Sequence, residues 1–246
     1  MARLTKEEVY ATRRNAILDA AQRLIYAKGY EQMTIQDLLD ELGISKGAFY
    51  HYFDAKPELL EALVERMREQ TEALILPIAR DPQLPALEKL RRLFPTLARW
   101  KSARKEFLLG LLPVLYADEN AIFRQKTLTL AHSMLGPPLT EIIRQGVAED
   151  VLTTAYPDQI GSVVVSLLWG MGETVAEVIL AGGLQHDGLA PATRPTLERM
   201  FAAYTEALER ILGAPPGSFP LMEPGTLDEW FAPSDGVEKE GDRARA

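Results

Sequence analysis

Apolar residues recur along most of this chain every three or four positions, the spacing that places them on one face of an α-helix. The first stripe runs over 17–25 and ends at Gly29, a residue type common at helix C-termini. A second stripe runs over 35–42, directly behind Thr34. Thr34 and Asp37 have the spacing of a capping box, so they predict the N-terminus of this second helix.

The rest of the chain is also predicted to be helical. Ser45 is a good N-cap for a short third helix, and Pro57 marks the start of a fourth. Further helices are expected over 85–101 (kinked at Pro95), 104–116, 119–135, 138–149, 157–181 and 194–212, with a break at Gly136-Pro137-Pro138. There is no alternating strand pattern, so we predict an all-α fold.

The turn between the second and third helices is very short. Only Gly43 and Ile44 separate the second stripe from the Ser45 cap, and so tight a turn between two short amphipathic helices is typical of a helix-turn-helix. One face of the third helix is apolar, through Phe49 and Phe53. The opposite face has no acidic residue, which suits a surface that lies against phosphates and base edges.

A longer string of residues carries a family resemblance. In order, it comprises Gly29-Tyr30, Thr34-Ile35, Gly43-Ile44-Ser45-Lys46-Gly47, Phe49-Tyr50-His51-Tyr52-Phe53 and Lys56-Pro57-Glu58-Leu59-Leu60. It resembles the signature of the TetR (tetracycline repressor) family of bacterial transcriptional regulators. Two departures are Tyr52, where histidine is common, and Pro57, where glutamate is common, and neither changes the expected fold.

The resemblance implies a set of DNA contacts, with the third helix in the major groove. The implied phosphate contacts are Thr34, Tyr50, His51 and Lys56; the residues near base edges are Lys46, Gly47 and Ala48, with Ser45 beside them at the helix start. Arg3 and Lys6 could form an arm in the adjacent minor groove. Other readings stay open: Tyr50 and His51 as half-buried surface residues, Thr34 as a cap alone, and Lys56 as a routine exposed lysine.

The composition of the chain excludes several kinds of functional site. The 246 residues include no cysteine and three histidines, so disulfides, thiolate metal sites and thiol nucleophiles are excluded, and we expect no metal and no cofactor. The formal charge of −8 lies entirely in residues 57–246, because residues 1–56 are neutral. An acidic body should repel DNA and keep non-specific binding weak. The string 43–47 matches G-x-S-x-G, but a helical stripe precedes it, so we reject a catalytic Ser45.

Residues 57–212 are predicted to form a larger helical domain. Large side chains at helix-interior spacing suggest an apolar cavity, and in the TetR family this domain binds an effector. The candidate ligand contacts are Trp100, Arg104, Phe107, Tyr116, Phe123, His132, Trp169 and Glu173. For any one of the apolar residues, plain core packing is the better reading.

The helix over Pro157–Ala181 is unusually rich in small residues. A glycine costs a helix interior roughly 1 kcal/mol, so several in one helix favour close approach to another helix. We expect this helix and Arg194–Leu212 to form a homodimer interface, as in the TetR family; close packing within one subunit is the alternative. Residues 213–246 read as a Pro/Gly-rich and charged tail, loosely ordered, in which Leu227, Trp230 and Phe231 could dock on the body.

The sequence therefore predicts three parts: a helix-turn-helix DNA-binding domain over 1–56, an effector-binding and dimerisation domain over 57–212, and the tail. We expect a cytoplasmic, ligand-responsive regulator, a repressor rather than an activator, that binds a pseudo-palindromic double-stranded DNA operator, with no membrane segment and no enzymatic activity. One rival is a helical small-molecule-binding or enzymatic protein with a vestigial helix-turn-helix. A second is a DNA-bound architectural protein.

Overall fold

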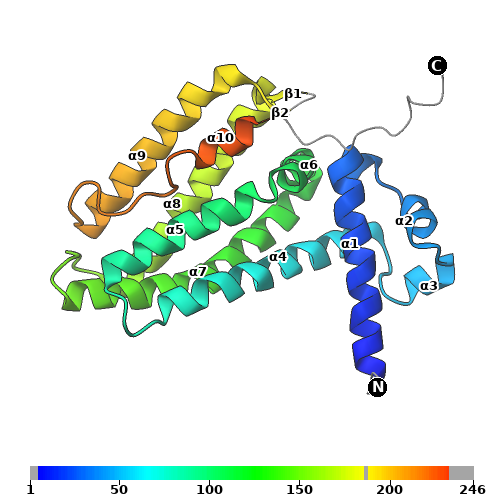
Figure 1. The fold of residues 1–246 in the computed structure, drawn as a ribbon, viewed down its shortest axis with the longest axis horizontal. Helices are drawn as coiled ribbons and strands as arrows, with labels where there is room; N and C mark the ends of the chain where they lie inside the picture. Colours follow the sequence, from blue (N-terminus) through cyan, green and yellow to red (C-terminus); the bar gives the residue numbers. More distant parts are fainter. Residues whose placement is uncertain (1–4, 186–187, 233–246) are drawn as a thin grey trace, which may run out of the picture.

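A computed structural model describes residues 5–185 and 188–232 and is built almost entirely from helices (Figure 1). The α-helices are α1 (Lys6–Gln32), α2 (Ile35–Leu42), α3 (Lys46–Tyr50), α4 (Lys56–Ala79), α5 (Ala86–Ser102), α6 (Lys105–Leu115), α7 (Ala121–Ala148), α8 (Pro157–Val178), α9 (Arg194–Leu212) and α10 (Thr226–Phe231). Short 3-10 turns cover Asp118–Asn120 and Pro191–Thr193. The all-α prediction is confirmed. A two-residue antiparallel pair, β1 (Leu184–Gln185) and β2 (Gly188–Leu189), interrupts the helices after α8.

The first three helices gather at one end of the molecule, and α4 leads from them into the larger bundle (Figure 1). Their core holds the predicted stripes, with Phe49 and Leu38 fully buried. Phe107 and Leu111 of α6 belong to the same apolar cluster. The packing is therefore continuous across the boundary expected at residue 56.

Helix α1 begins eleven residues earlier than the first apolar stripe. Thr5 caps it by accepting a hydrogen bond from the Glu8 amide, and the Glu8 carboxylate accepts one from the Thr5 amide, which completes a capping box. Lys6 therefore lies in the first turn of α1 rather than in an extended arm, and Arg3 lies outside the described residues. Gly29, at φ 76°, interrupts the helical backbone as predicted, and a short helical turn follows it.

The predicted break at Gly136-Pro137-Pro138 is wrong, because α7 runs through both prolines with helical backbone angles. Prolines remove backbone donors from the helix, yet this segment is fixed by packing against α8. A Cβ at Gly161 of α8 would lie 3.0 Å from the Gly136 oxygen and 2.9 Å from the Thr140 nitrogen. The burial of this close crossing outweighs the local cost of the prolines.

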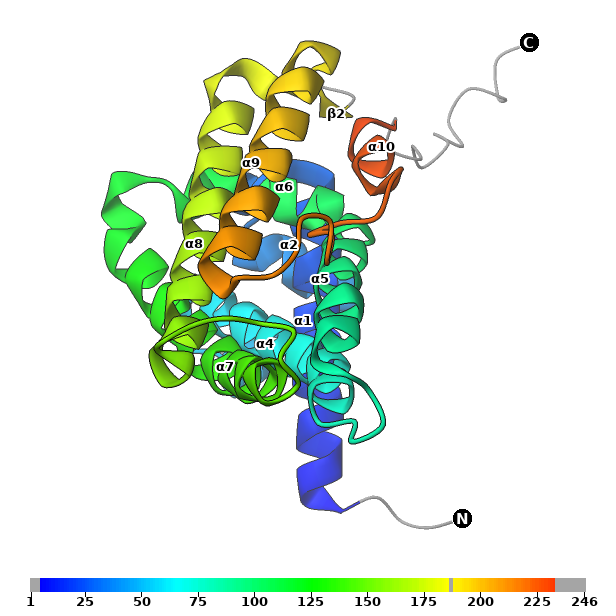
Figure 2. The same cartoon turned by 90° about the vertical axis from the view of Figure 1, so that its left-hand side faces the viewer.

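Helices α8 and α9 lie side by side on one flank of the bundle (Figure 2). α8 ends at Val178, three residues before the predicted end, and passes into a π-helical turn over Ile179–Gly183. By length and composition, Pro157–Gly182 is apolar enough to cross a membrane, although only 22% of its most apolar window is buried inside this chain. Much of the apolar surface of α8 is therefore uncovered in the single chain.

The expectation of a loosely ordered tail is wrong for residues 214–232. This stretch runs from α9 back over α5, and the Phe219 side chain is fully buried against Phe94. The Arg91 guanidinium donates to the Ser218 oxygen and fixes the same stretch. The predicted docking of Leu227, Trp230 and Phe231 is confirmed, because α10 packs them into a third apolar cluster. Residues 233–246 lie outside the described part of the chain.

Candidate nucleic-acid interface

Helix α3 presents one buried and one exposed face. The Ser45 hydroxyl accepts a hydrogen bond from the Ala48 amide at 3.2 Å and thereby caps the helix. Phe49 and Phe53 are buried beneath it, which turns the opposite face outward. Tyr50 is 41% exposed, and Ser45, Lys46, Gly47 and His51 are exposed with it, while Ala48 is half-buried. The structure thus brings the predicted base-edge residues together on one open surface.

Thr34 caps α2 as predicted, but its hydroxyl is already engaged. It accepts from the Asp37 amide at 3.1 Å and donates to the Asp37 carboxylate at 2.7 Å. The Lys28 ammonium lies 2.6 Å from the same carboxylate. Hydrogen bonds from Lys28, then from the side chain and the backbone of Thr34, lower the pKa of Asp37 to about 2. To donate to a bound phosphate, the Thr34 hydroxyl would have to give up its hydrogen bond to the Asp37 carboxylate.

Lys56 is not a free surface lysine. Its ammonium donates to the backbone carbonyl oxygen of Glu31 at 3.2 Å and lies 4.2 Å from the centre of the Tyr30 ring. Partial burial lowers its pKa, against the opposing effect of the Glu31 and Asp37 carboxylates. The side chain links the end of α1 to the start of α4, close to the α2 cap. The structure therefore gives Lys56 a packing role beside its predicted phosphate contact.

Sequence reasoning missed Tyr10, which supports the edge of this surface. The Tyr10 ring lies 4.8 Å from the Tyr52 ring and 5.8 Å edge-on from the His51 ring, centre to centre. Tyr10 belongs to the turns of α1 that precede the first apolar stripe. The capping box at Thr5 and Glu8 was the signal that could have found them.

The predicted ligand residues fall in separate places. Trp100 and Arg104 meet at the end of α5, where the guanidinium lies 4.5 Å from the centre of the indole ring. The Trp100 indole nitrogen is buried without a hydrogen-bond partner among the described residues. Phe107 is buried against the N-terminal helices, in the core position that was its alternative reading.

A second group lies where α6, α7 and α8 meet. Burial, and then the Glu173 carboxylate, raise the pKa of Tyr116 to about 12. Arg124 lies 5.5 Å from the centre of the Tyr116 ring. Trp169 is half-buried on α8, like Glu173. This group therefore brings the uncharged phenol of Tyr116 close to the Glu173 carboxylate and the Arg124 guanidinium.

His132 lies elsewhere, on the outer side of the α7–α8 contact. Its ring nitrogens are 3.1 Å from the Ser162 hydroxyl and 3.3 Å from the Ser166 hydroxyl. These hydroxyls occupy both nitrogens; the two serines are exposed and His132 is half-buried. His132 therefore shares a surface with the glycine-rich helix and lies apart from Trp100 and Tyr116.

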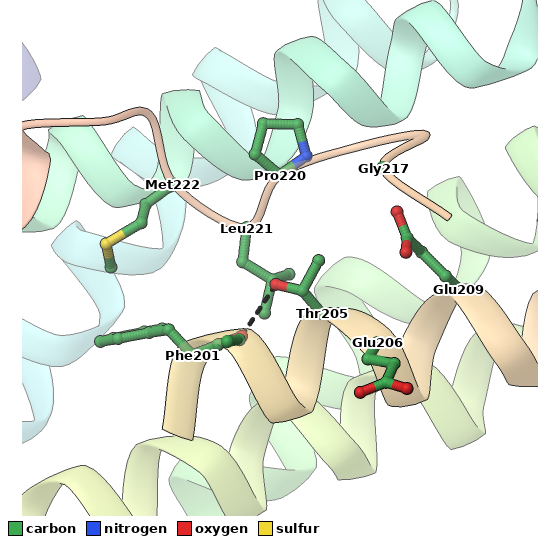
Figure 3. A pocket seen from close by; sticks show the side chains of 9 residues that line it. Phe201, Thr205, Glu206, Glu209, Gly217, Pro220, Leu221 and Met222 are labelled. Atoms are coloured by element: carbon green, nitrogen blue, oxygen red, sulfur yellow. Dashed lines mark hydrogen bonds between the residues drawn. The ribbon is translucent and has the colours of Figure 1, made fainter. Parts of the chain in front are cut away.

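Two hollows in the described part of the chain are open to solvent. One, of about 360 Å³, lies between α9 and residues 217–222 and is lined by Phe201, Thr205 and Glu209 among others (Figure 3). No predicted ligand residue lines it. The other, of about 170 Å³, lies between α4 and α7 and includes Phe123.

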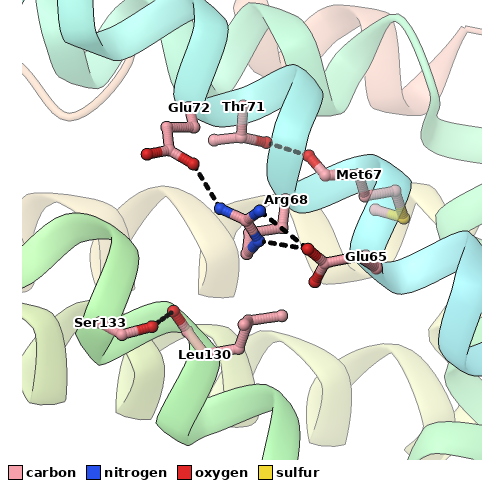
Figure 4. Close-up of polar contacts among 7 residues, drawn as sticks. All are labelled: Glu65, Met67, Arg68, Thr71, Glu72, Leu130 and Ser133. Carbon is pink, nitrogen blue, oxygen red and sulfur yellow. Dashed lines mark hydrogen bonds and ion pairs between the residues drawn. The ribbon is translucent and has the colours of Figure 1, made fainter.

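Close to the second hollow, α4 carries its own ion pairs. The Arg68 guanidinium lies between the carboxylates of Glu65 and Glu72, one turn to either side (Figure 4). These two acids raise the pKa of Arg68. Arg68 is therefore already neutralised on the surface that faces Leu130 and Ser133 of α7. Within residues 5–185 and 188–232, no group of three or more histidine, aspartate or glutamate side chains is placed to hold a metal ion.

Comparison with known proteins locates the strongest similarity in the N-terminal helices. Residues 17–63 match the model of "Bacterial regulatory proteins, tetR family". The probable HTH-type transcriptional regulator ArpR of Pseudomonas putida is 34% identical over 93 residues, 38% of this chain and 44% of ArpR. The HTH-type transcriptional repressor BepR of Brucella suis is 33% identical over 78 residues, 32% of this chain and 37% of BepR. The matched stretch thus spans less than half of these relatives.

Solved structures extend the likeness of fold to the whole bundle. A TetR-family transcriptional regulator from Pectobacterium atrosepticum superimposes with a TM-score of 0.63 at 20% identity, covering 86% of this chain and all (100%) of that one. A transcriptional regulator from Cytophaga hutchinsonii gives 0.58 at 17% identity, covering 80% and 97%. The N-terminal helices therefore carry the motif of the tetR family of bacterial regulatory proteins, and most of the chain shares its fold with solved structures of transcriptional regulators.

Proposed function

We propose that this chain is a ligand-responsive transcriptional repressor that binds a pseudo-palindromic DNA operator as a homodimer. The observation that carries the proposal is the two-sided α3 helix: Phe49 is buried, and Lys46, Gly47, Tyr50 and His51 lie exposed on the other side. A Cβ at Gly47 would meet no atom within 4 Å, so the backbone here is open to close approach by a base edge. A DNA-binding regulator with these features works in the cytoplasm and needs no catalytic centre.

The contacts divide by type. Lys46, Gly47 and Ala48, with Ser45 at the helix start, address base edges, whereas Thr34, Tyr50, His51 and Lys56 bind phosphates. The N-terminus of α2 offers backbone donors to a phosphate, and the Thr34 hydroxyl can join them by giving up its hydrogen bond to Asp37. The Lys28 ammonium offsets the Asp37 charge that would otherwise repel it.

The dimer is expected to form through α8 and α9. Val163 of α8 and Leu180 of the π-helical turn after it are exposed apolar residues, and a Cβ at Gly172 of α8 would meet nothing within 4 Å in the single chain. Gly161, in contrast, is used within the subunit against α7. A two-fold axis along this surface would place two α3 helices on half-sites about 34–36 Å apart, one turn of DNA.

The effector is expected to be a small apolar or amphipathic molecule bound in the larger domain. It releases the operator if it prefers the state in which the two α3 helices have the wrong spacing for DNA. Trp100 with Arg104, and Tyr116 with Glu173, are the pairs that offer an apolar wall beside a polar group. Phe107 and His132 have other partners in the single chain.

The test is operator binding by fluorescence anisotropy, with a DNA duplex from upstream of the gene that encodes the chain. A Lys46→Ala, Tyr50→Ala double variant should lose most of the specific affinity, because it removes a charge and a donor from the exposed face. Lys126→Ala, on α7, is the matched control for a lost lysine and should bind as the wild type does. Equal binding by wild type and double variant contradicts the proposal, and effector binding without any operator binding favours the vestigial helix-turn-helix.

Lys56→Ala addresses the phosphate contacts separately. It should weaken binding to all sequences alike and reduce the slope of log affinity against log salt by about one. Because Lys56 also packs on Tyr30, Lys56→Arg serves as the comparison that keeps the charge. A change in sequence preference with an unchanged salt slope would place Lys56 outside the phosphate contacts.

A further inference from the structure

Helix α10 is held in a groove made by segments far from it in sequence. Its apolar side chains, Leu227, Trp230 and Phe231, pack against Leu109 of α6, Ile179 after α8, and Leu197 of α9. In Figure 2 it lies at the edge of the bundle near α5 and β2, at the end of the extended 213–225 stretch. The floor of the groove is apolar, and α10 covers it.

Two backbone oxygens at the C-terminal end of α10 bind one buried ammonium. The Lys105 side chain is among the few buried charged groups, with 8% of the residue exposed. Its nitrogen donates to the backbone carbonyl oxygen of Glu229 at 2.6 Å and to that of Ala232 at 2.8 Å, and the Glu106 carboxylate is 3.7 Å away. Beside it, the Trp230 indole donates to the buried Ser102 hydroxyl at 2.7 Å.

Two features make α10 separable from the rest of the chain. It has six residues, far below the length at which a helix is stable alone, so its structure depends on the groove. Gly225 precedes it at φ 86°, a backbone conformation that favours glycine. Before Gly225, the stretch is anchored independently by Phe219 and Leu221 in another apolar cluster. Residues 226–232 can therefore leave while residues 214–224 stay in place.

We propose that α10 occupies a ligand site, and that the groove beneath it binds an amphipathic carboxylate in its place. The ligand carboxylate replaces the backbone carbonyl oxygens of Glu229 and Ala232 as the acceptor for Lys105. Its apolar chain fills the space of the Trp230 and Phe231 side chains. This deepens the proposed function, because it assigns the class of effector and a site outside the predicted ligand residues.

The charges around the groove favour an anion once α10 has left. An ammonium buried without acceptors is strongly unfavourable, so an occupant must supply an acceptor at Lys105. Departure of α10 also removes the Asp228 and Glu229 carboxylates. It leaves Arg194, which pairs with Asp228 and lies 4.5 Å from the centre of the Phe231 ring, with the Glu198 carboxylate at 3.9 Å as its remaining acidic partner. Glu106 and Glu198 remain, so the loss of Asp228 and Glu229 leaves Lys105 and Arg194 balanced by two acids instead of outnumbered by four. A neutral apolar molecule would leave the ammonium with Glu106 at 3.7 Å and without a replacement for the two oxygens that it now bonds.

The first experiment measures binding of decanoate by calorimetry, without DNA. A chain that ends at Glu223 should bind decanoate at least tenfold more tightly than the full chain, because α10 no longer competes. In the shortened chain, Lys105→Met should lose at least tenfold, Lys126→Met should lose nothing, and decanol should bind more weakly than decanoate. Equal affinity in the full and shortened chains, or in the Lys105→Met variant, overturns the proposal.

If the shortened chain fails to fold, a Leu227→Ala, Trp230→Ala variant of the full chain replaces it, with the same expectation. Hydrogen exchange of the wild type provides a second readout. Decanoate should speed exchange of the amides of 226–232 and leave those of 214–221 unchanged, whereas unchanged exchange in 226–232 at saturating decanoate overturns displacement. These measurements do not use DNA. Decanoate binding at Lys105 without operator binding would reject the proposed repressor and keep the site.

Discussion

The Asp37 carboxylate combines a helix cap with an ion pair, and its charge is held by both. The Thr34 amide and hydroxyl and the Lys28 ammonium lie within 2.7 Å of it. An aspartate in an unfolded chain has a pKa of about 3.9, whereas the pKa of Asp37 is about 2. Because the folded-state pKa is the lower one, Asp37 stabilises the fold fully above about pH 4, and the contribution is lost as pH falls towards 2.

We therefore expect Asp37→Asn to lower the melting temperature at neutral pH and to show a shallower loss of stability in acid. The difference from wild type should be constant from about pH 5 to 7 and should shrink between about pH 4 and pH 2. Thermal unfolding followed by circular dichroism across this range measures it. Asp54→Asn, an exposed aspartate at the end of the α3 turn, is the control. A difference that persists unchanged to pH 2 would show that the Asp37 charge does not contribute.

Tyr10 is the residue that extends the candidate interface beyond the motif. Tyr10→Ala removes ring contacts with His51 and Tyr52, and aromatic pairs contribute about 0.5–1.5 kcal/mol. We expect operator affinity to fall by roughly three- to tenfold, since 1.4 kcal/mol corresponds to about tenfold. Tyr10→Phe should keep most of the affinity. Anisotropy titrations compare the two, and equal losses would assign the effect to the phenol oxygen instead of the ring.

At the scale of elements, the N-terminal helices are the part best predicted from sequence. Thr34 and Ser45 accept from amides three residues ahead, and the Gly43 amide donates to a carbonyl four residues back, so the ends of α2 and the start of α3 follow from local chemistry. The start of α1 has an equally local capping box that apolar periodicity alone did not reveal. The continuity of α7 through Pro137 and Pro138 depends on α8, and no local signal carries it.

The α7–α8 crossing makes a prediction about two glycines of one helix. Gly161→Ala places a Cβ against α7 and should destabilise the fold by about 1–3 kcal/mol. Gly172→Ala meets no atom within 4 Å in the single chain, so in the monomer it should instead gain up to about 1 kcal/mol through helix propensity. Urea unfolding compares them. Equal effects of both substitutions would contradict close packing at Gly161.

At the scale of the whole molecule, the exposed apolar side of α8 is the surface that needs a partner. Val163→Glu puts a charge on the proposed dimer interface, and a buried unpaired charge is strongly unfavourable there. We expect light scattering to show a shift from dimer to monomer, together with weaker operator binding. Ile122→Glu, at a more exposed apolar residue of α7, should leave the dimer intact. A Val163→Glu protein that stays dimeric would move the interface elsewhere.

The sequence by itself determined the resemblance to the tetR family, the all-helical class and the exposed face of α3. Caps, periodicity and a tight turn act between residues a few positions apart, and a pattern of side chains encodes them. Only the tertiary structure decided which predicted ligand residues lie together, where residues 214–232 pack, and that Tyr10 supports His51. These depend on contacts between distant segments, such as Lys105 with the Glu229 oxygen 124 residues later. Burial and the loss of chain entropy on closing such long loops are properties of the whole fold, and no local pattern records them.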